Sequence, residues 1–214
     1  MNTKGILLSI VLAFVFNWVS AQDFEGKIET VMTYVDNEDI KDVTKVPLTT
    51  EFTVKGERTK IKTNLAQLNI EMLIIVDHKK ERATMACGAY GYGVVVDMGK
   101  DHFGPKSTKE YQIKYTKQTK KILGYTCKKA IVYKSNLVQE VWYTKSLTKL
   151  QEGELPYIDG FVMEYNDIIN DSKVKFTVTS IKKKSIQDEA FNPPVEYVQM
   201  SKEDAMKGYG FMMD

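Results

Sequence analysis

Residue types that perform chemistry are scarce in this sequence. Its two histidines, His78 and His102, stand far apart in the chain, and neither has a partner at the spacing of metal ligands. A zinc site needs three or four ligands, so we predict exposed loop histidines and no bound metal. No Gly-x-Ser-x-Gly motif marks a hydrolase nucleophile. The sequence therefore predicts a protein that is not an enzyme and holds no cofactor.

A glycine-rich segment at residues 88–93 has the composition of a phosphate-binding loop. Dinucleotide and phosphate loops lead into a helix, and no helical pattern follows Gly93. We therefore interpret the segment as a flexible connection between strands. The functional alternative is a mobile rim of a binding face.

Two cysteines, Cys87 and Cys127, are the candidates for redox chemistry. They lack a Cys-x-x-Cys spacing and a nearby histidine, so we expect no redox or nucleophilic role. In an oxidising compartment one disulfide between them would close a loop of about 40 residues and stabilise the fold by ~4 kcal/mol. The alternative is two separate thiols on different strands, because the sequence does not give the Cα separation that a disulfide requires.

The N-terminus has the pattern of a secretion signal. Lys4 precedes an apolar run over residues 6–16, and residues 19–21 (Val-Ser-Ala) fit the −3 and −1 positions of a cleavage site. The run is much shorter than the ~20 residues of a membrane-spanning helix. We therefore predict a signal peptide over residues 1–21, cleavage between Ala21 and Gln22, and a periplasmic or secreted protein without stable membrane insertion.

The composition of the remaining residues, 22–214, predicts one domain. They suffice for a single core, and no linker or shift in composition divides them. Loss of Lys4 reduces 30 basic residues to 29 against 28 acidic ones, a net charge of +1. A charge so near zero argues against binding to nucleic acid.

Lysine is nevertheless clustered, at residues 117–121, 128–129 and 182–184. We interpret these clusters as exposed strand faces, where lysine blocks unwanted pairing of sheet edges. The alternative is transient contact with an anionic membrane surface.

Beyond the signal, apolar and polar residues alternate with a period of two. Phe24 and Ile28 share one face of the first such segment, and Lys27 and Glu29 share the other. This alternation is typical of antiparallel strands with one buried face and one in water. It predicts strands near residues 24–34, 49–55, 57–63, 71–77, 80–86, 93–98, 109–119, 127–134, 138–144, 160–168 and 173–184, with hairpin turns at 54–57 and 77–80.

Helical patterns are confined to two short segments. Ser201 is placed to cap a helix over residues 202–207 that Gly208 ends, and a weaker helical turn covers residues 146–152. We therefore predict a mainly β fold, a single long and strongly curved antiparallel sheet with one or two short helices. Such a sheet forms a half-barrel or an open barrel.

Several short segments resemble one group of exported proteins. Residues 124–129 (Gly-Tyr-Thr-Cys-Lys-Lys) are similar to a Gly-Tyr-x-Cys-Lys-Lys segment of secreted Bacteroidota envelope proteins, the GLPGLI family and related domain-of-unknown-function proteins. Residues 154–160 stand where that family has its Gly-Leu-Pro-Gly-Leu-Ile string, which favours the related group. Further segments that resemble the group are residues 55–58, 75–77, 141–144, 155–156, 160–161, 164–165 and 174–184.

This resemblance implies the fold of the periplasmic lipoprotein carriers LolA and LolB, a curved sheet with an apolar concave side. The group has no assigned activity, so the resemblance supplies no catalytic residues. A sheet of this length with one apolar face must cover that face or present it to a ligand.

Aromatic residues and a methionine in consecutive C-terminal strands are the candidates for such a face. Phe161, Met163 and Tyr165 occupy alternate positions of one strand and should share a face, with Trp142 and Phe176 on flanking strands. These five residues are interpreted either as an ordinary core or as the lining of a cavity for an acyl chain.

We therefore predict a non-enzymatic protein of the cell envelope that binds a hydrophobic ligand or lipid on the concave face of its sheet. The alternative is an interaction module that docks a partner protein on the same face. A deep apolar cavity would favour the first, and a shallow groove or an exposed strand edge would favour the second.

Overall fold

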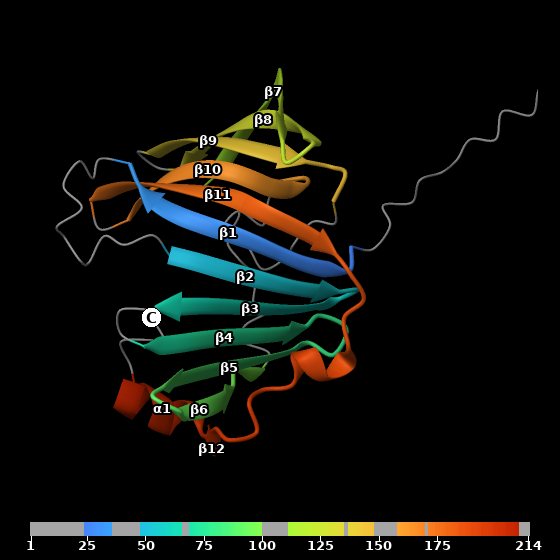
Figure 1. Cartoon of the computed structure of the whole chain (residues 1–214). Coiled ribbons are helices and arrows are strands. Elements are labelled where there is room, and N and C mark those ends of the chain that lie inside the picture. The colour runs from blue at the N-terminus through green and yellow to red at the C-terminus, as the bar shows by residue number, and fades with distance from the viewer. Residues whose placement is uncertain are drawn as a thin grey trace, which may run out of the picture.

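The computed structural model describes residues 24–35, 48–65, 69–99, 111–134, 137–147, 158–169 and 171–209 (Figure 1). The predicted signal peptide, His102 and most of the predicted helical turn at residues 146–152 lie outside these ranges. The elements are β1 (Gly26–Tyr34), β2 (Leu48–Lys55), β3 (Arg58–Leu65), β4 (Ile70–Asp77), β5 (Arg82–Ala89), β6 (Tyr92–Asp97), β7 (Tyr111–Ile122), β8 (Tyr125–Lys134), β9 (Leu137–Thr144), β10 (Phe161–Ile169), β11 (Ser172–Lys183), the 3₁₀ helix η4 (Asp188–Phe191), β12 (Val198–Met200) and α1 (Lys202–Tyr209).

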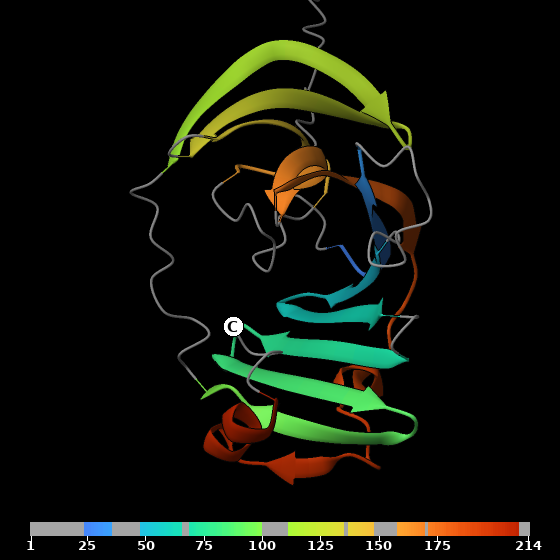
Figure 2. The ribbon, with the colours of Figure 1, turned by 90° about the vertical axis from the view of Figure 1, so that its left-hand side faces the viewer.

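The twelve strands form one sheet in the order β12-β6-β5-β4-β3-β2-β1-β11-β10-β9-β8-β7. Figure 2 shows its curvature: β7 and β8 arch over one end, and β2 to β6 form the other. The predicted mainly β, strongly curved sheet is therefore confirmed. The prediction that it is antiparallel throughout is wrong at one pair, because the short strand β12, absent from the sequence prediction, runs parallel to β6.

The hydrogen-bond ladders differ between two halves of this sheet, which we call the regular half (β2–β6) and the shifted half (β7–β11). The ladders that join β1 through β6 run without a register shift. Register shifts interrupt the pairs β1/β11, β9/β10 and β7/β8. Extra residues of this kind bend a strand and increase its twist. Two of these three pairs, β9/β10 and β7/β8, lie within the shifted half, where Figure 2 shows the strongest arching.

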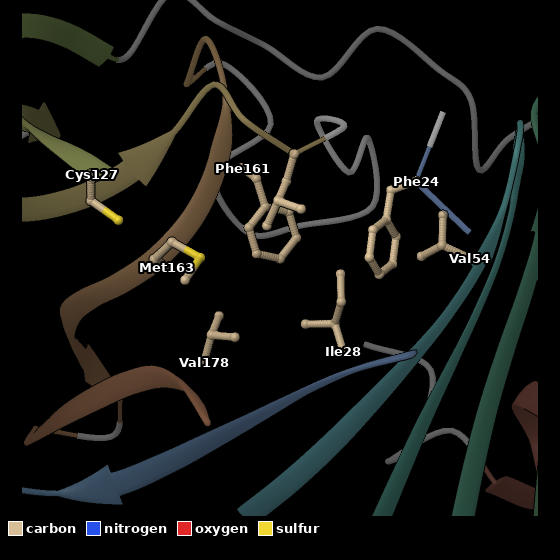
Figure 3. Packing of buried hydrophobic residues seen from close by; sticks show 8 residues of the cluster. Phe24, Ile28, Val54, Cys127, Phe161, Met163 and Val178 are labelled. Atoms are coloured by element: carbon tan, nitrogen blue, oxygen red, sulfur yellow. The ribbon is translucent and has the colours of Figure 1, made fainter. Parts of the chain in front are cut away.

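Buried side chains from both halves meet in one cluster, which we call the bend core. Figure 3 shows Ile28 of β1 and Val54 of β2 pointing toward Phe161 and Met163 of β10. We call the sheet face that carries Ile28 and Val54 the inner face, and the opposite one the outer face. The buried members of the bend core are Phe24, Ile28, Val54, Cys127, Leu147, Phe161, Met163 and Val178.

The chain after β11 forms a strap, residues 186–200, over the outer face of the regular half. Ile186 and Phe191 of the strap pack against Ile75. The strap then adds β12 to the free edge of β6, and α1 follows and contacts β6.

The backbone N–H of Asp204 donates to Ser201 Oγ over 3.1 Å, which confirms the predicted cap of α1. No helix in the described ranges is long and apolar enough to cross a membrane.

Candidate functional site

The inner face of the regular half carries no charged residue. Residues paired across adjacent strands share a face, so the unshifted ladders extend the inner face from β2 to β6. Each inner position in three rows across these strands is apolar or threonine. The rows are Val54-Thr59-Val76-Ala83, Phe52-Ile61-Ile74-Met85-Val96 and Thr50-Thr63-Met72-Cys87-Val94.

Exposure changes along these strands. Val54, Val76 and Ala83, in the row that includes the bend-core residue Val54, are buried. Met85 and Val96 of the middle row are also buried. The other apolar side chains of the middle and third rows are only half-buried, and we call them the inner patch. The inner patch consists of Phe52, Ile61, Met72, Ile74, Cys87 and Val94.

Polar side chains on this face are few, and two of the three threonines of the inner rows pair with each other. The hydroxyls of Thr50 and Thr63 lie 3.1 Å apart and form a hydrogen bond with each other. A ligand on the inner patch would therefore meet methyl groups, thioether sulfur and one aromatic ring, with few free hydrogen-bonding groups.

The outer face of the same strands is charged. Lys27 Nζ lies 2.6 Å from Glu51 Oε1, and Lys62 forms an ion pair with Glu71. Lys60 is crowded among these groups: burial, then the charges of Lys27 and Lys62, lowers the pKa of its ammonium group. The two faces of the regular half thus differ sharply, with charges on the outer face and none among the inner rows.

Where the outer face is apolar, the strap covers it. Tyr197 packs against Leu73 and its neighbours, and its ring lies directly over Gly88 and Gly93. A Cβ atom added to Gly88 would stand 2.1 Å from Tyr197 Oη, and one added to Gly93 would stand 2.5 Å from the ring. The glycine-rich segment does connect two strands, as predicted. Gly88 and Gly93 also make room for the packed ring of Tyr197.

The five residues predicted to line a binding face do not share one face. Phe161 and Met163 are 3% and 1% exposed in the bend core, and Trp142 packs against that core. Tyr165 packs instead against a second buried cluster, Ala130, Val132, Val141, Tyr143 and Ile158, and stacks on Phe176 with ring centroids 4.5 Å apart. The register shift between Val162 and Glu164 breaks the alternation on which the prediction depended.

Trp142 lies among charged groups. Lys120 Nζ is 4.4 Å and Lys129 Nζ 5.9 Å from the centre of its ring, within the range of cation–π attraction. Lys120 also donates to Glu164 over 2.7 Å, and Lys175 lies 3.4 Å from the same carboxylate. Burial opposes ionisation of Glu164, but the two lysines outweigh it and lower the pKa of the carboxyl group. These contacts tie β7, β9, β10 and β11 together.

The candidate disulfide is absent, because Cys87 and Cys127 are not bridged. Cys87 lies on β5 and Cys127 on β8, with seven strands between them in the sheet order. No hydrogen-bond ladder joins β5 to β8, so strand pairing does not bring the two thiols together. Burial raises the pKa of both thiols, so neither is an activated nucleophile.

His78 lies in the β4–β5 turn, where its backbone carbonyl accepts from Glu81 N–H over 3.3 Å. It is half-buried, whereas the sequence predicted an exposed histidine. Among the described residues, no group of three or more histidine, cysteine, aspartate or glutamate side chains is placed to hold a metal ion.

One protein family matches most of the sequence. The model of the family described as "N-glycanase peptide, N-terminal domain" matches residues 33–203. The chain belongs to this family. The matching family differs from the GLPGLI group that the short motifs resemble. A comparison with curated proteins gives no match.

Two solved structures of other proteins share the fold of this chain. PNGF-II in a C2 crystal form is 18% identical with a TM-score of 0.52, over 85% of this chain and 32% of that one. An uncharacterized conserved protein from Thermus thermophilus is 6% identical with a TM-score of 0.50, over 83% of this chain and 91% of that one. The chain therefore spans about a third of the length of PNGF-II.

The sequence analysis did not predict the inner patch. The signal was present: in β2 and β4, Phe52, Met72 and Ile74 alternate with Glu51, Thr53 and Glu71. The aromatic-rich C-terminal strands were favoured instead, because aromatic residues dominate the surface that a ligand buries. A comparison of charge between alternate positions of each strand would have found the uncharged face.

Proposed function

We propose that this chain is a non-enzymatic binding module that holds the acyl chain of a lipid against the inner patch. The observation that supports the proposal most is the absence of charge from all three inner rows of β2 to β6. The inner patch is apolar and half-buried, whereas the apolar part of the outer face is covered by the strap.

The chemistry of the inner patch favours an acyl chain over other ligands. An extended peptide would lose the hydrogen bonds that its backbone makes to water, at a cost that this face does not offset. A sugar would need polar partners for its hydroxyl groups. An acyl chain has no hydrogen bonds to lose, and the methionine of the inner patch adapts to flexible apolar ligands.

The second candidate is docking of an amphipathic helix from a partner protein on the same face. A helix satisfies its own backbone hydrogen bonds, so it too tolerates an apolar surface. At ~4.8 Å between strands, the five strands of the regular half span about 19 Å, wide enough for one helix of ~10 Å diameter.

We further propose that the module acts outside the cytoplasm, as one domain over residues 22–214 released by cleavage after Ala21. The apolar run near Lys4 and the small residues before Gln22 support export. The motifs similar to the GLPGLI group support a place in the cell envelope. N-terminal sequencing of the secreted protein tests this, and a retained Met1 would overturn it.

The test of lipid binding uses a charge placed on the inner patch. Met72→Glu puts a carboxylate on the half-buried apolar surface, where an acyl chain would desolvate it. We expect a folded variant, by circular dichroism, that no longer binds a fluorescent fatty acid. Thr49→Glu is the matched control, because Thr49 is exposed on the other face of β2 and should keep binding.

Absence of saturable binding of any acyl probe to the wild-type protein would reject the lipid proposal. A Met72→Glu variant that binds the fatty acid as well as wild type would move the site away from the inner patch. In either case, binding of an amphipathic helical peptide that Met72→Glu abolishes would support the second candidate.

A further inference from the structure

The hairpin of β7 and β8 is strongly basic. Residues 111–134 contain seven lysines and no aspartate or glutamate. The chain as a whole is close to neutral, with 30 basic and 28 acidic residues. The positive charge is therefore concentrated at one edge of the sheet, where β7 is the outermost strand (Figure 1).

Only part of this charge is compensated by neighbouring strands. Lys129 lies 2.5 Å from Glu140 and Lys120 lies 2.7 Å from Glu164. Among the described residues, no carboxylate pairs with the four exposed lysines of the hairpin. These are Lys114, Lys117, Lys121 and Lys128.

The turn of the hairpin carries an exposed leucine. Ile122 pairs with Tyr125, so Leu123 and Gly124 form a two-residue turn, and their φ angles are 49° and 83°. Turns with positive φ at both positions favour asparagine and glycine, and a leucine there is unusual. Leu123 is 48% exposed, and Lys121 and Lys128 stand on either side of the turn.

The edge of β7 is unsuited to pairing with another strand. Between Tyr115 and Thr119 its register against β8 shifts, which interrupts the regular row of backbone groups that an added strand would need. Figure 2 shows the hairpin strongly arched. Side chains, and not the strand edge, are therefore what this region offers to a partner.

A second lysine cluster lies at the same end of the sheet. The strands β8 to β11 alternate in direction, so the C-terminal end of β11 lies at the end that bears the β7–β8 turn. Lys183 and Lys184 follow there and are exposed. They add positive charge to this end of the sheet.

We propose that the β7–β8 hairpin docks on a bilayer that contains anionic phospholipids, with Lys121 and Lys128, which share one face of the hairpin, at the headgroups and Leu123 inserted between them. Unpaired lysines attract an anionic lipid surface, and an exposed apolar residue among them adds insertion at the interface. A nucleic acid would use the lysines but not the leucine at the turn. This inference goes beyond the proposed acyl site and does not depend on it.

The test is sedimentation of the purified full chain with vesicles of phosphatidylcholine and phosphatidylglycerol in equal parts. Lys121→Gln with Lys128→Gln should weaken vesicle binding about 25-fold, because each lysine near an anionic surface contributes about fivefold. Leu123→Ser should give a smaller loss. The double change to arginine keeps the charge and should keep binding.

The matched control removes two exposed lysines from another turn. Lys79→Gln with Lys80→Gln in the β4–β5 turn changes the net charge equally and should leave vesicle binding within a few-fold of wild type. Binding should disappear for pure phosphatidylcholine vesicles. It should also fall at salt near 1 M, where the Debye length is about 3 Å.

Three outcomes would overturn the proposal. They are no binding of the wild-type protein to anionic vesicles, equal losses for the hairpin and control pairs, and equal affinity for duplex DNA and for vesicles. Met72→Glu should leave vesicle binding unchanged, so failure of this proposal and failure of the acyl site are separate results.

Discussion

The regular half and the shifted half are both built from strands with alternating apolar and polar residues, but they place their apolar side chains differently. In the regular half, unbroken ladders keep every second residue on one face, and one face is wholly uncharged. In the shifted half, irregular pairings accompany strong bending, and Phe161 and Met163 of β10 become part of the bend core. The uncharged, partly exposed inner face of the regular half therefore depends on its unshifted register.

The largest expected effect contrasts two methionines. Met163→Glu would place an unpaired carboxylate in the bend core, where Met163 is 1% exposed. The variant should fail to fold, because burying an unpaired charge costs more than ~4 kcal/mol. Circular dichroism and thermal melting check this, with Met72→Glu of the half-buried inner patch as the folded counterpart. A stable Met163→Glu variant would mean that β10, and not the regular half, lines a cavity.

A smaller effect is expected where the strap covers the regular half. Gly93→Val would drive a side chain into the ring of Tyr197, 2.5 Å from the Cβ position. It should destabilise the protein by roughly 2 kcal/mol and make the strap more sensitive to proteolysis than β7–β11. Chemical denaturation and limited proteolysis check this. Thr49→Val, at an exposed strand position of β2, is the control. Unchanged protection of the strap in Gly93→Val would contradict the packing of Tyr197 on this face.

The smallest effect is a pH dependence at the start of the strap. Lys55 and Arg58 lie 2.7 Å and 2.6 Å from Asp188, and their hydrogen bonds lower the pKa of its carboxyl group to about 2. Because this value lies below the ordinary 3.8, the stabilisation is present above pH 3.8 and is lost as pH falls through 2. Asp188→Asn should therefore be less stable than wild type at neutral pH and equal to it below pH 2. Equal melting temperatures of the two proteins at neutral pH would show that the pair contributes nothing.

The sequence predicted those features of the sheet that depend only on residues close together in the chain. Alternation placed the strands β1 to β11 within a few residues, the turn at residues 54–57 is the β2–β3 hairpin, and Ser201 caps the C-terminal helix. The three residues of β12 are too few for a period to show. Their parallel pairing with β6 depends on the path of the strap, which no local pattern records.

The candidate site was predicted less well, for two physical reasons. One register shift near Met163 separates Tyr165 from Phe161, and single-strand alternation cannot anticipate a bulge that arises from pairing. Cys87 and Cys127 lie on strands that are not neighbours in the sheet and are not bridged, and this strand order could not be predicted from the residues around either cysteine. In contrast, the uncharged inner face of β2 to β6 can be predicted from the charges at alternate positions of each strand.

The most direct test of the central claim is the reactivity of Cys87, which belongs to the inner patch, with Cys127 in the bend core as the internal reference. Alkylation of each thiol is followed by mass spectrometry while a fatty acid is added to saturation. A lipid on the inner patch should slow alkylation of Cys87 in proportion to the occupied fraction and leave that of Cys127 unchanged. An unchanged rate at Cys87 with the fatty acid demonstrably bound would contradict the proposed site.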